Sequence, residues 1–131
     1  LMASIFTKII NKEIPSYTIL ENENFISFLD INPLTLGHCL VVPKKEIDYL
    51  FDLDDVFLNE ILIFSKKISS SLIRTVDCNR VGVSVIGLEV PHAHVHLIPI
   101  NNENDMNFSN KRIEMSSEDF ADLQSRIIKN L

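Results

Sequence analysis

The sequence is poor in cysteine, and its two cysteines, Cys39 and Cys78, form neither a CxxC motif nor a disulfide-rich framework. Reduced thiols in a cytoplasmic protein are the expected state, although a single bridge between them also fits the sequence. Long apolar runs are absent too, since none approaches the roughly 20 residues of a membrane-spanning helix. The N-terminus lacks the basic and then apolar layout of a signal peptide. We therefore expect a cytoplasmic protein with no membrane partner.

Positive charge is also scarce. The chain of 131 residues has 12 Lys and Arg against 18 Asp and Glu, for a formal net charge of −6. Binding of a nucleic acid polymer requires a basic face, so this balance argues against such a partner. A small phosphate ligand remains compatible with it, because a few local donors can hold a phosphate inside a negative protein. The length suits one domain that buries a sizeable core.

What is present is a regular succession of helix and strand patterns over residues 1–131, which predicts a single α+β domain. The expected elements are a short helix over 5–11 capped by Ser4, strands over 17–20, 25–29 and 39–42, a long helix over 54–76, strands over 80–86 and 93–100, and a final helix from a cap at Ser116 or Ser117 to residue 131. Strands joined by short links pair antiparallel, and the long helix must cover one face of the sheet. Residues 101–110 are polar and rich in Asn, so an exposed loop is expected there.

Histidines give the strongest chemical signal. Three of the four lie at alternate positions of one run, His92-Ala93-His94-Val95-His96. Alternate residues of a strand point to the same face, so the three imidazoles would share one side of the sheet while the apolar residues between them face the core. The run therefore predicts a functional site formed by the imidazoles on one face of the sheet.

Three interpretations of this run compete. A metal site is disfavoured, because alternate strand residues lie about 6.6 Å apart and the outer pair about 13 Å apart, so one ion could hardly take all three imidazoles. A structural hydrogen-bond network gives no reason for strict alternation. Chemistry on phosphorus fits best, because a neutral imidazole is a competent nucleophile at neutral pH. His94 has an imidazole on each side and is the expected nucleophile, with no metal or other cofactor required.

The run resembles the histidine triad signature, His-φ-His-φ-His-φ-φ with φ apolar, of the histidine triad (HIT) nucleotide-binding proteins and hydrolases. Three further blocks are similar to that family and make the match far more specific: Ser4 to Ile10 with Glu13-Ile14-Pro15, Phe28 to Pro33, and Gly37 to Lys45. The resemblance implies a HIT-like fold, with a five-stranded antiparallel sheet and two main helices. It also implies a homodimer whose sheets join side by side, and a purine nucleoside 5′-phosphoryl compound as the small-molecule partner.

The same resemblance implies residue roles. His94 would form a nucleotidyl-histidine intermediate, and His96 and His38 would support the phosphate and orient the nucleophile. His92 would belong to the same network. Asp30 would accept hydrogen bonds from the ribose hydroxyls. The remaining nucleotide-binding residues would be an apolar slot for the base, made of Phe6, Ile9, Phe28 and Ile31, and two residues of the loop before the triad, Gly87 and Glu89.

This loop departs from the family pattern. Leu88 stands where Gln is usual and Glu89 where a hydroxyl side chain is usual, and the loop is shorter. An ionised Glu89 would repel a phosphate, but it would suit the ammonium of an amine leaving group. Hydrolysis of a nucleoside phosphoramidate or AMP ester to a nucleoside monophosphate is therefore the leading hypothesis. The alternatives are cleavage of dinucleoside polyphosphates and a nucleotide-binding scaffold dimer with weak turnover.

Overall fold

The computed structural model describes residues 3–131 and has the α+β architecture that the sequence predicts. Its elements in chain order are α1 (Ile5–Ile10), β1 (Thr18–Glu21), β2 (Phe25–Leu29), β3 (Cys39–Pro43), the 3-10 helix η1 (Leu50–Asp52), α2 (Asp55–Thr75), β4 (Arg80–Ser84), β5 (Val95–Ile100), the 3-10 helix η2 (Glu103–Met106) and α3 (Ser117–Lys129). No helix of residues 3–131 combines the length and the apolar character that crossing a bilayer requires.

Each α-helix begins at a side chain that satisfies one of its first free amides. The capping residues are Ser4 for α1, Asp54 for α2 and Ser116 for α3, and each accepts a hydrogen bond from the backbone N–H three residues further on. Short polar side chains are favoured at these positions because the first amides of a helix have no partner within it. The helix starts predicted from the sequence are confirmed.

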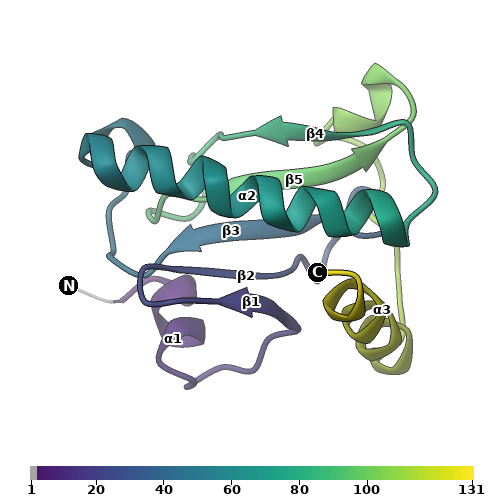
Figure 1. Cartoon of the computed structure of the whole chain (residues 1–131), viewed down its shortest axis with the longest axis horizontal. Coiled ribbons are helices and arrows are strands. Elements are labelled where there is room, and N and C mark those ends of the chain that lie inside the picture. The colour runs from purple at the N-terminus through teal and green to yellow at the C-terminus, as the bar shows by residue number, and fades with distance from the viewer. Residues whose placement is uncertain (1–2) are drawn as a thin grey trace.

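The five strands form one antiparallel sheet in the order β1-β2-β3-β5-β4 (Figure 1). Helices α2 and α3 pack on one face, and α1 packs on the other (Figure 1). Strand β5, which contains His96, lies between β3 and β4. The end of the histidine run is therefore built into the interior of the sheet, with a hydrogen-bonded strand on each side.

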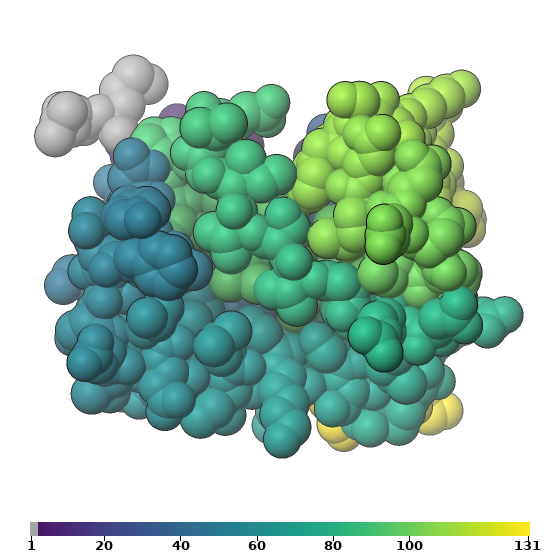
Figure 2. Space-filling view, turned by 90° about the horizontal axis from the view of Figure 1, so that it is seen from above, coloured from purple at the N-terminus to yellow at the C-terminus, as the bar shows by residue number. Residues whose placement is uncertain are grey.

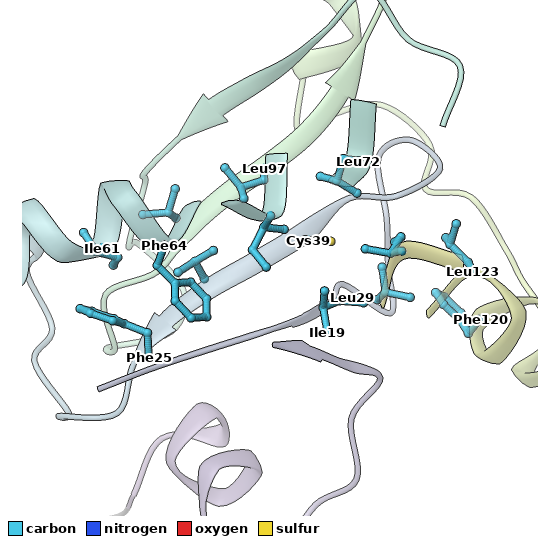
Figure 3. Close-up of a cluster of buried hydrophobic side chains, with 14 residues drawn as sticks. Ile19, Phe25, Leu29, Cys39, Ile61, Phe64, Leu72, Leu97, Phe120 and Leu123 are labelled. Carbon is cyan, nitrogen blue, oxygen red and sulfur yellow. The ribbon is translucent and has the colours of Figure 1, made fainter. Parts of the chain in front are cut away.

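The sheet separates two cores. The helix-side core joins the sheet to α2 and α3, as Figure 3 shows for its main side chains, and the cleft-side core comprises Phe6, Ile9, Ile26, Phe28, Leu40 and Val42. Strand β2 contributes to both, because Phe25 and Leu29 point to the first and Ile26 and Phe28 to the second. All five residues of β2 are buried as a result. The remaining residue of β2 is Ser27. Its Oγ is the one buried side-chain nitrogen or oxygen in residues 3–131 that lacks a hydrogen-bond partner.

The region around the triad differs from the prediction. Strand β5 begins at Val95 rather than at Ala93, and β4 ends two residues earlier than expected. The amide of Ala93 donates to the Ile47 carbonyl instead of pairing within the sheet, which draws the chain away from the strand geometry. Of the three triad histidines, His96 alone lies in a paired strand, opposite Leu40 of β3.

The two cysteines form no disulfide. Cys39 is buried in the helix-side core and Cys78 is partly exposed after α2. Near Cys39, Gly37 has φ of 93°, and a Cβ at this position would lie 3.1 Å from Val76 Cγ2 and 3.2 Å from Pro99 Cγ. Glycine is required there because the chain turns in the left-handed region against two side chains. This turn brings His38 to the start of β3.

Candidate active site

A cleft of about 630 Å³ opens on the face of the sheet that carries α1. Its walls are the start of α1, the turn at 30–32 after β2, the loop at 86–90 before the triad, and the segment at 108–112 after η2. His94 and His96 line the cleft between these walls. From above, the surface is hollowed between the green loop that precedes β5 and the yellow-green segment that follows it (Figure 2).

His94 is held in one tautomer. Its Nδ1 lies 2.7 Å from the carbonyl oxygen of His92, and because a carbonyl can only accept, Nδ1 carries the proton and donates it. The neutral imidazole then has its lone pair on Nε2. The ring packs edge-on against Phe6, with ring centres 4.9 Å apart, so its orientation is fixed on a second side. The arrangement presents an unprotonated nitrogen in the cleft, which is what a nucleophile requires.

His96 is held in the opposite tautomer, through His38. The amide of Leu34 donates to His38 Nδ1 at 3.0 Å, which leaves the proton of this imidazole on Nε2. His38 Nε2 lies 2.9 Å from His96 Nδ1 and therefore donates to it. The proton of His96 is then on Nε2, the nitrogen away from His38. His96 can donate a hydrogen bond to an oxygen of a bound ligand.

Both of these imidazoles resist protonation. Burial lowers the pKa of His38 to about 3, and the nearby charges of His96 and Arg112 act in the same direction. Burial likewise lowers the pKa of His96 to about 4, reinforced by His94 and Arg112. Both rings are therefore neutral at neutral pH, and the tautomer chain from Leu34 to His96 is preserved there.

His92 lies behind the cleft and not in it, which corrects the prediction that three imidazoles share one working face. Its ring is fully buried, and Nε2 donates to the Pro43 carbonyl at 2.7 Å. Nδ1 accepts a hydrogen bond from Ser4 Oγ, also at 2.7 Å. Because the chain at His92 has already left the strand, its side chain points toward α1 instead of following the alternation. Its carbonyl, which holds His94, is its contribution to the site.

A carboxylate completes the support of His92. Glu46 Oε1 accepts hydrogen bonds from the backbone N–H of Ser4 and from Thr7 Oγ1, both at 2.7 Å, and lies 3.9 Å from His92 Nδ1. These bonds lower the pKa of Glu46, so it is ionised at neutral pH. Burial lowers the pKa of His92, while the Pro43 carbonyl and Glu46 oppose that effect. Neither Ser4 nor Glu46 was predicted to serve the site, because nothing in their sequence spacing links them to His92.

Asp30 reaches the cleft from the turn after β2. Its Oδ1 accepts a hydrogen bond from the Asn32 amide at 2.8 Å, while Oδ2 lies 3.6 Å from His38 Nε2. Burial raises the pKa of the carboxyl, and the Asn32 amide and the charge of Arg112 oppose that effect. The carboxylate therefore has free acceptor capacity at the edge of the cleft, where it could take hydroxyl groups of a ligand.

One group of side chains has the composition of a metal site. The potential ligand atoms of Asp30, His38 and His96 lie within 4.8 Å of one another. However, the two facing nitrogens of the histidines already share a proton in a 2.9 Å hydrogen bond. His38 Nδ1 is occupied by the Leu34 amide, so His38 Nε2 has no lone pair for an ion. As arranged, these residues do not fit a metal.

The residues proposed for the base slot are divided between two layers. Phe6 and Ile31 line the cleft, as do Gly87 and Glu89 of the loop. Ile9 and Phe28 do not, since they lie beneath Phe6 in the cleft-side core, where the Phe6 and Phe28 rings are 5.7 Å apart. Their positions in the apolar lining are taken by Ile5 and Leu40. The sequence pattern identified the apolar surroundings but could not tell the lining from its support.

The segment at 108–112 is the wall that sequence reasoning missed. Phe108, within the stretch predicted to be an exposed loop, packs edge-on against the His96 ring at 4.9 Å and the His38 ring at 6.4 Å. Arg112 also lines the cleft. An aromatic and a cationic residue in an otherwise polar loop were the available signal. Local sequence alone, however, does not show that such a loop folds back over β5.

The chain is similar to known proteins over most of its length. The HIT domain family model matches residues 11–103. The chain is 38% identical over 135 residues to an uncharacterized HIT-like protein of Borreliella burgdorferi, covering 97% of each. It is 36% identical over 102 residues to a Saccharomyces cerevisiae protein named adenosine 5′-monophosphoramidase HNT1, covering 77% of this chain and 65% of that one. A solved Hit-like protein from Bartonella henselae is similar at a TM-score of 0.83 and 28% identity, covering 98% of this chain and 96% of that one.

Proposed function

The chain belongs to the HIT domain family, and from this premise we propose that it hydrolyses nucleoside phosphoramidates or AMP esters to a nucleoside monophosphate. The observation that carries the proposal is the tautomer of His94, whose Nδ1–H is bound to the His92 carbonyl and whose Nε2 is free in the cleft. Family membership supports hydrolase activity of this general type. The name of the yeast relative supports the choice of a phosphoramidate.

The proposed reaction has two steps through a nucleotidyl-histidine. His94 Nε2 attacks phosphorus, and a nitrogen–phosphorus bond forms as the bond to the leaving amine or alcohol breaks. His96 Nε2–H donates to a non-bridging oxygen while negative charge develops there. Because His96 is neutral, the leaving group takes its proton from water. The hydroxide formed by that proton transfer attacks phosphorus, the bond to His94 breaks and returns its electron pair to Nε2, and the nucleoside monophosphate leaves.

The nucleoside is oriented by the turn after β2 and by α1. The Asp30 carboxylate accepts hydrogen bonds from the ribose hydroxyls, and the base lies against Phe6 and Ile31. This orientation brings the 5′-phosphoryl group to His94 and His96, next to the loop that contains Gly87 and Glu89. A purine is the expected base because the yeast relative is named as an adenosine 5′-monophosphoramidase. No metal or other cofactor takes part, so a chelator should leave turnover unchanged.

Intact-mass analysis tests the proposal. The protein is mixed with an adenosine phosphoramidate and quenched rapidly without acid, because a phosphorus–imidazole bond is acid-labile. A transient gain of one adenylyl mass, absent in His94→Ala and present in the exposed-site control Lys111→Met, is expected. Tight nucleotide binding without adduct or product would contradict the enzyme and identify a binding scaffold instead.

Glu89 supports an amine rather than a polyphosphate leaving group. Its side chain is exposed and lines the cleft, where its carboxyl group can face the departing group. We expect Glu89→Gln and Glu89→Ser to lose activity on an adenosine phosphoramidate and to gain on a dinucleoside polyphosphate. The measurement is the ratio of the two kcat/KM values. An unchanged ratio would remove Glu89 from substrate selection and reopen dinucleoside polyphosphate cleavage as the main activity.

We further propose a homodimer joined at β4. Support comes from the position of β4 at the edge of the sheet and from exposed apolar side chains there and on α2, with Val83 57% and Ile63 60% exposed. An apolar edge strand is a template for pairing with a second copy. Light scattering should give twice the chain mass for the natural protein and a monomer for Val83→Lys. A monomeric natural protein at all concentrations would contradict the dimer.

A further inference from the structure

Arg112 makes three contacts at the edge of the cleft. Its Nη1 donates to the Asn32 carbonyl at 2.8 Å, and its Nη2 donates to the Phe108 carbonyl at 3.4 Å. The guanidinium also lies 5.6 Å from the centre of the Phe108 ring, in a cation–π arrangement. The side chain therefore bridges the turn after β2 and the segment that follows η2.

This cation is not neutralised by the protein. Within residues 3–131, no carboxylate forms an ion pair with Arg112. The two carbonyls use two of its five N–H groups, so three remain for a ligand. The residue is half-buried, and the net charge of the chain is −6, so acidic side chains are plentiful elsewhere. An unpaired guanidinium beside a cleft in such a protein is available for an anion.

The proposed function already assigns His94 and His96 to the reacting phosphoryl group. In the proposed reaction His96 Nε2–H donates to that group, whereas Arg112 reaches the cleft from the segment after η2, where Phe108 contacts both His96 and Arg112. Its field still reaches the site, since it helps to hold down the pKa of Asp30, His38 and His96. Because Arg112 is attached to Asn32 and Phe108 and not to His94 or His96, an anionic group that binds it would be a second one, separate from the group that reacts at His94.

We propose that Arg112 binds a second phosphate group of the nucleotide, beyond the phosphoryl group that reacts at His94. The inference rests on the proposed nucleotide function. The fork of guanidinium N–H groups matches two phosphate oxygens at once. Glu89 lines a different wall of the cleft and disfavours an anion there, so the Arg112 wall is the one side where a further negative charge is stabilised. The second phosphate can belong to the ribose, which is compatible with an amine leaving group, or to the 5′ chain, in which case that phosphate takes the place of the amine as the leaving group.

Calorimetric binding of three nucleotides distinguishes these sources. AMP carries one phosphate, ADP adds one on the 5′ chain, and adenosine 3′,5′-bisphosphate adds one on the ribose. We expect either ADP or the bisphosphate to bind the natural protein about tenfold more tightly than AMP. The advantage should disappear in Arg112→Met, persist in part in Arg112→Lys, and remain whole in Lys111→Met, which removes the adjacent exposed cation. The favoured nucleotide identifies where the second phosphate lies.

Two results would overturn the inference. Equal affinity for all three nucleotides in the natural protein would show that no second phosphate is bound. A loss of AMP affinity in Arg112→Met as large as the loss for the favoured nucleotide would show that Arg112 acts on the reacting group or on the fold. By contrast, a natural protein that fails to bind AMP at all would overturn the nucleotide function itself, which separates the two failures.

Discussion

His94 and His96 are two residues apart and line the same cleft, yet each presents the opposite kind of nitrogen to it. His94 is held by a backbone carbonyl and keeps a lone pair on Nε2. His96 is held by an imidazole that itself accepts from the Leu34 amide, and it keeps a proton on Nε2. The difference arises from the group at the far end of each chain of hydrogen bonds, an acceptor in one case and a donor in the other. Under the proposed function, His94 attacks phosphorus and His96 stabilises the developing charge.

The largest expected loss of kcat follows from removing one histidine of this pair. His94→Ala removes the attacking nitrogen, and we expect kcat to fall by about 10⁴-fold or more. His96→Ala removes one donor to the phosphoryl oxygen and should cost about 10²-fold in kcat. Steady-state kinetics on an adenosine phosphoramidate measures both. Equal losses in the two variants would mean that the two histidines do not divide the work as their tautomers indicate.

Stability at low pH tests the neutral state of the His38–His96 pair. Unfolded imidazoles protonate near their ordinary pKa of 6.5, whereas the folded rings resist protonation down to about 3 and about 4. Below pH 6.5 the unfolded chain binds more protons, so stability present above that pH is lost as the pH falls toward the folded values. The expected slope is on the order of 1 kcal/mol per pH unit for each imidazole.

Urea unfolding at a series of mildly acidic pH values measures this slope. His38→Gln removes one of the two titrating groups and should flatten the dependence, whatever its own cost in stability. Lys111→Met, with no imidazole changed, should retain the full slope. An unchanged slope in His38→Gln would show that the ring is protonated in the folded state and that the tautomer assignment of His96 is incorrect.

A smaller loss of kcat is expected from a residue that acts on His94 indirectly, through His92. Glu46→Ala removes the acceptor for Ser4 and Thr7, which support His92 and hence the carbonyl that orients His94. We expect kcat to fall about tenfold with little change in KM, because the loss is of orientation and not of a substrate contact. Lys45→Ala is the matched control at an exposed neighbouring position. A rise in KM with kcat intact would contradict a role through His92.

The smallest expected effect is a change in the free energy of unfolding, caused by a polar group on the opposite face of the sheet from the cleft. The buried hydroxyl of Ser27 lacks a partner, so Ser27→Ala should raise the free energy of unfolding by about 1 kcal/mol and leave kcat unchanged. Ser71→Ala is the contrasting control, because Ser71 Oγ donates to the Ile127 carbonyl and its loss should destabilise by about the same amount. A destabilised Ser27→Ala protein would mean that the hydroxyl is satisfied after all.

Much of the framework could be predicted because its causes are local. Ser4 and Ser116 cap helices through bonds to amides three residues away, so short sequence patterns identify them. The start of β5 could not be predicted, because it depends on a bond between Ala93 and Ile47 that spans two elements. The same limit applies to Ile9 and Phe28, whose burial under Phe6 follows from the packing of α1 on the sheet.

The sequence by itself determined which side chains are available for chemistry and which family the chain resembles, because these depend on residue type and spacing. Only the tertiary structure decided which ring nitrogen of each imidazole carries the proton and whether the ring lines the cleft. The proton of His94 is placed by a carbonyl two residues away, but that of His96 is placed by Leu34 through His38, and His92 is anchored by Pro43, Ser4 and Glu46. A proton goes to whichever ring nitrogen faces an acceptor, and folding alone brings these distant acceptors and donors together.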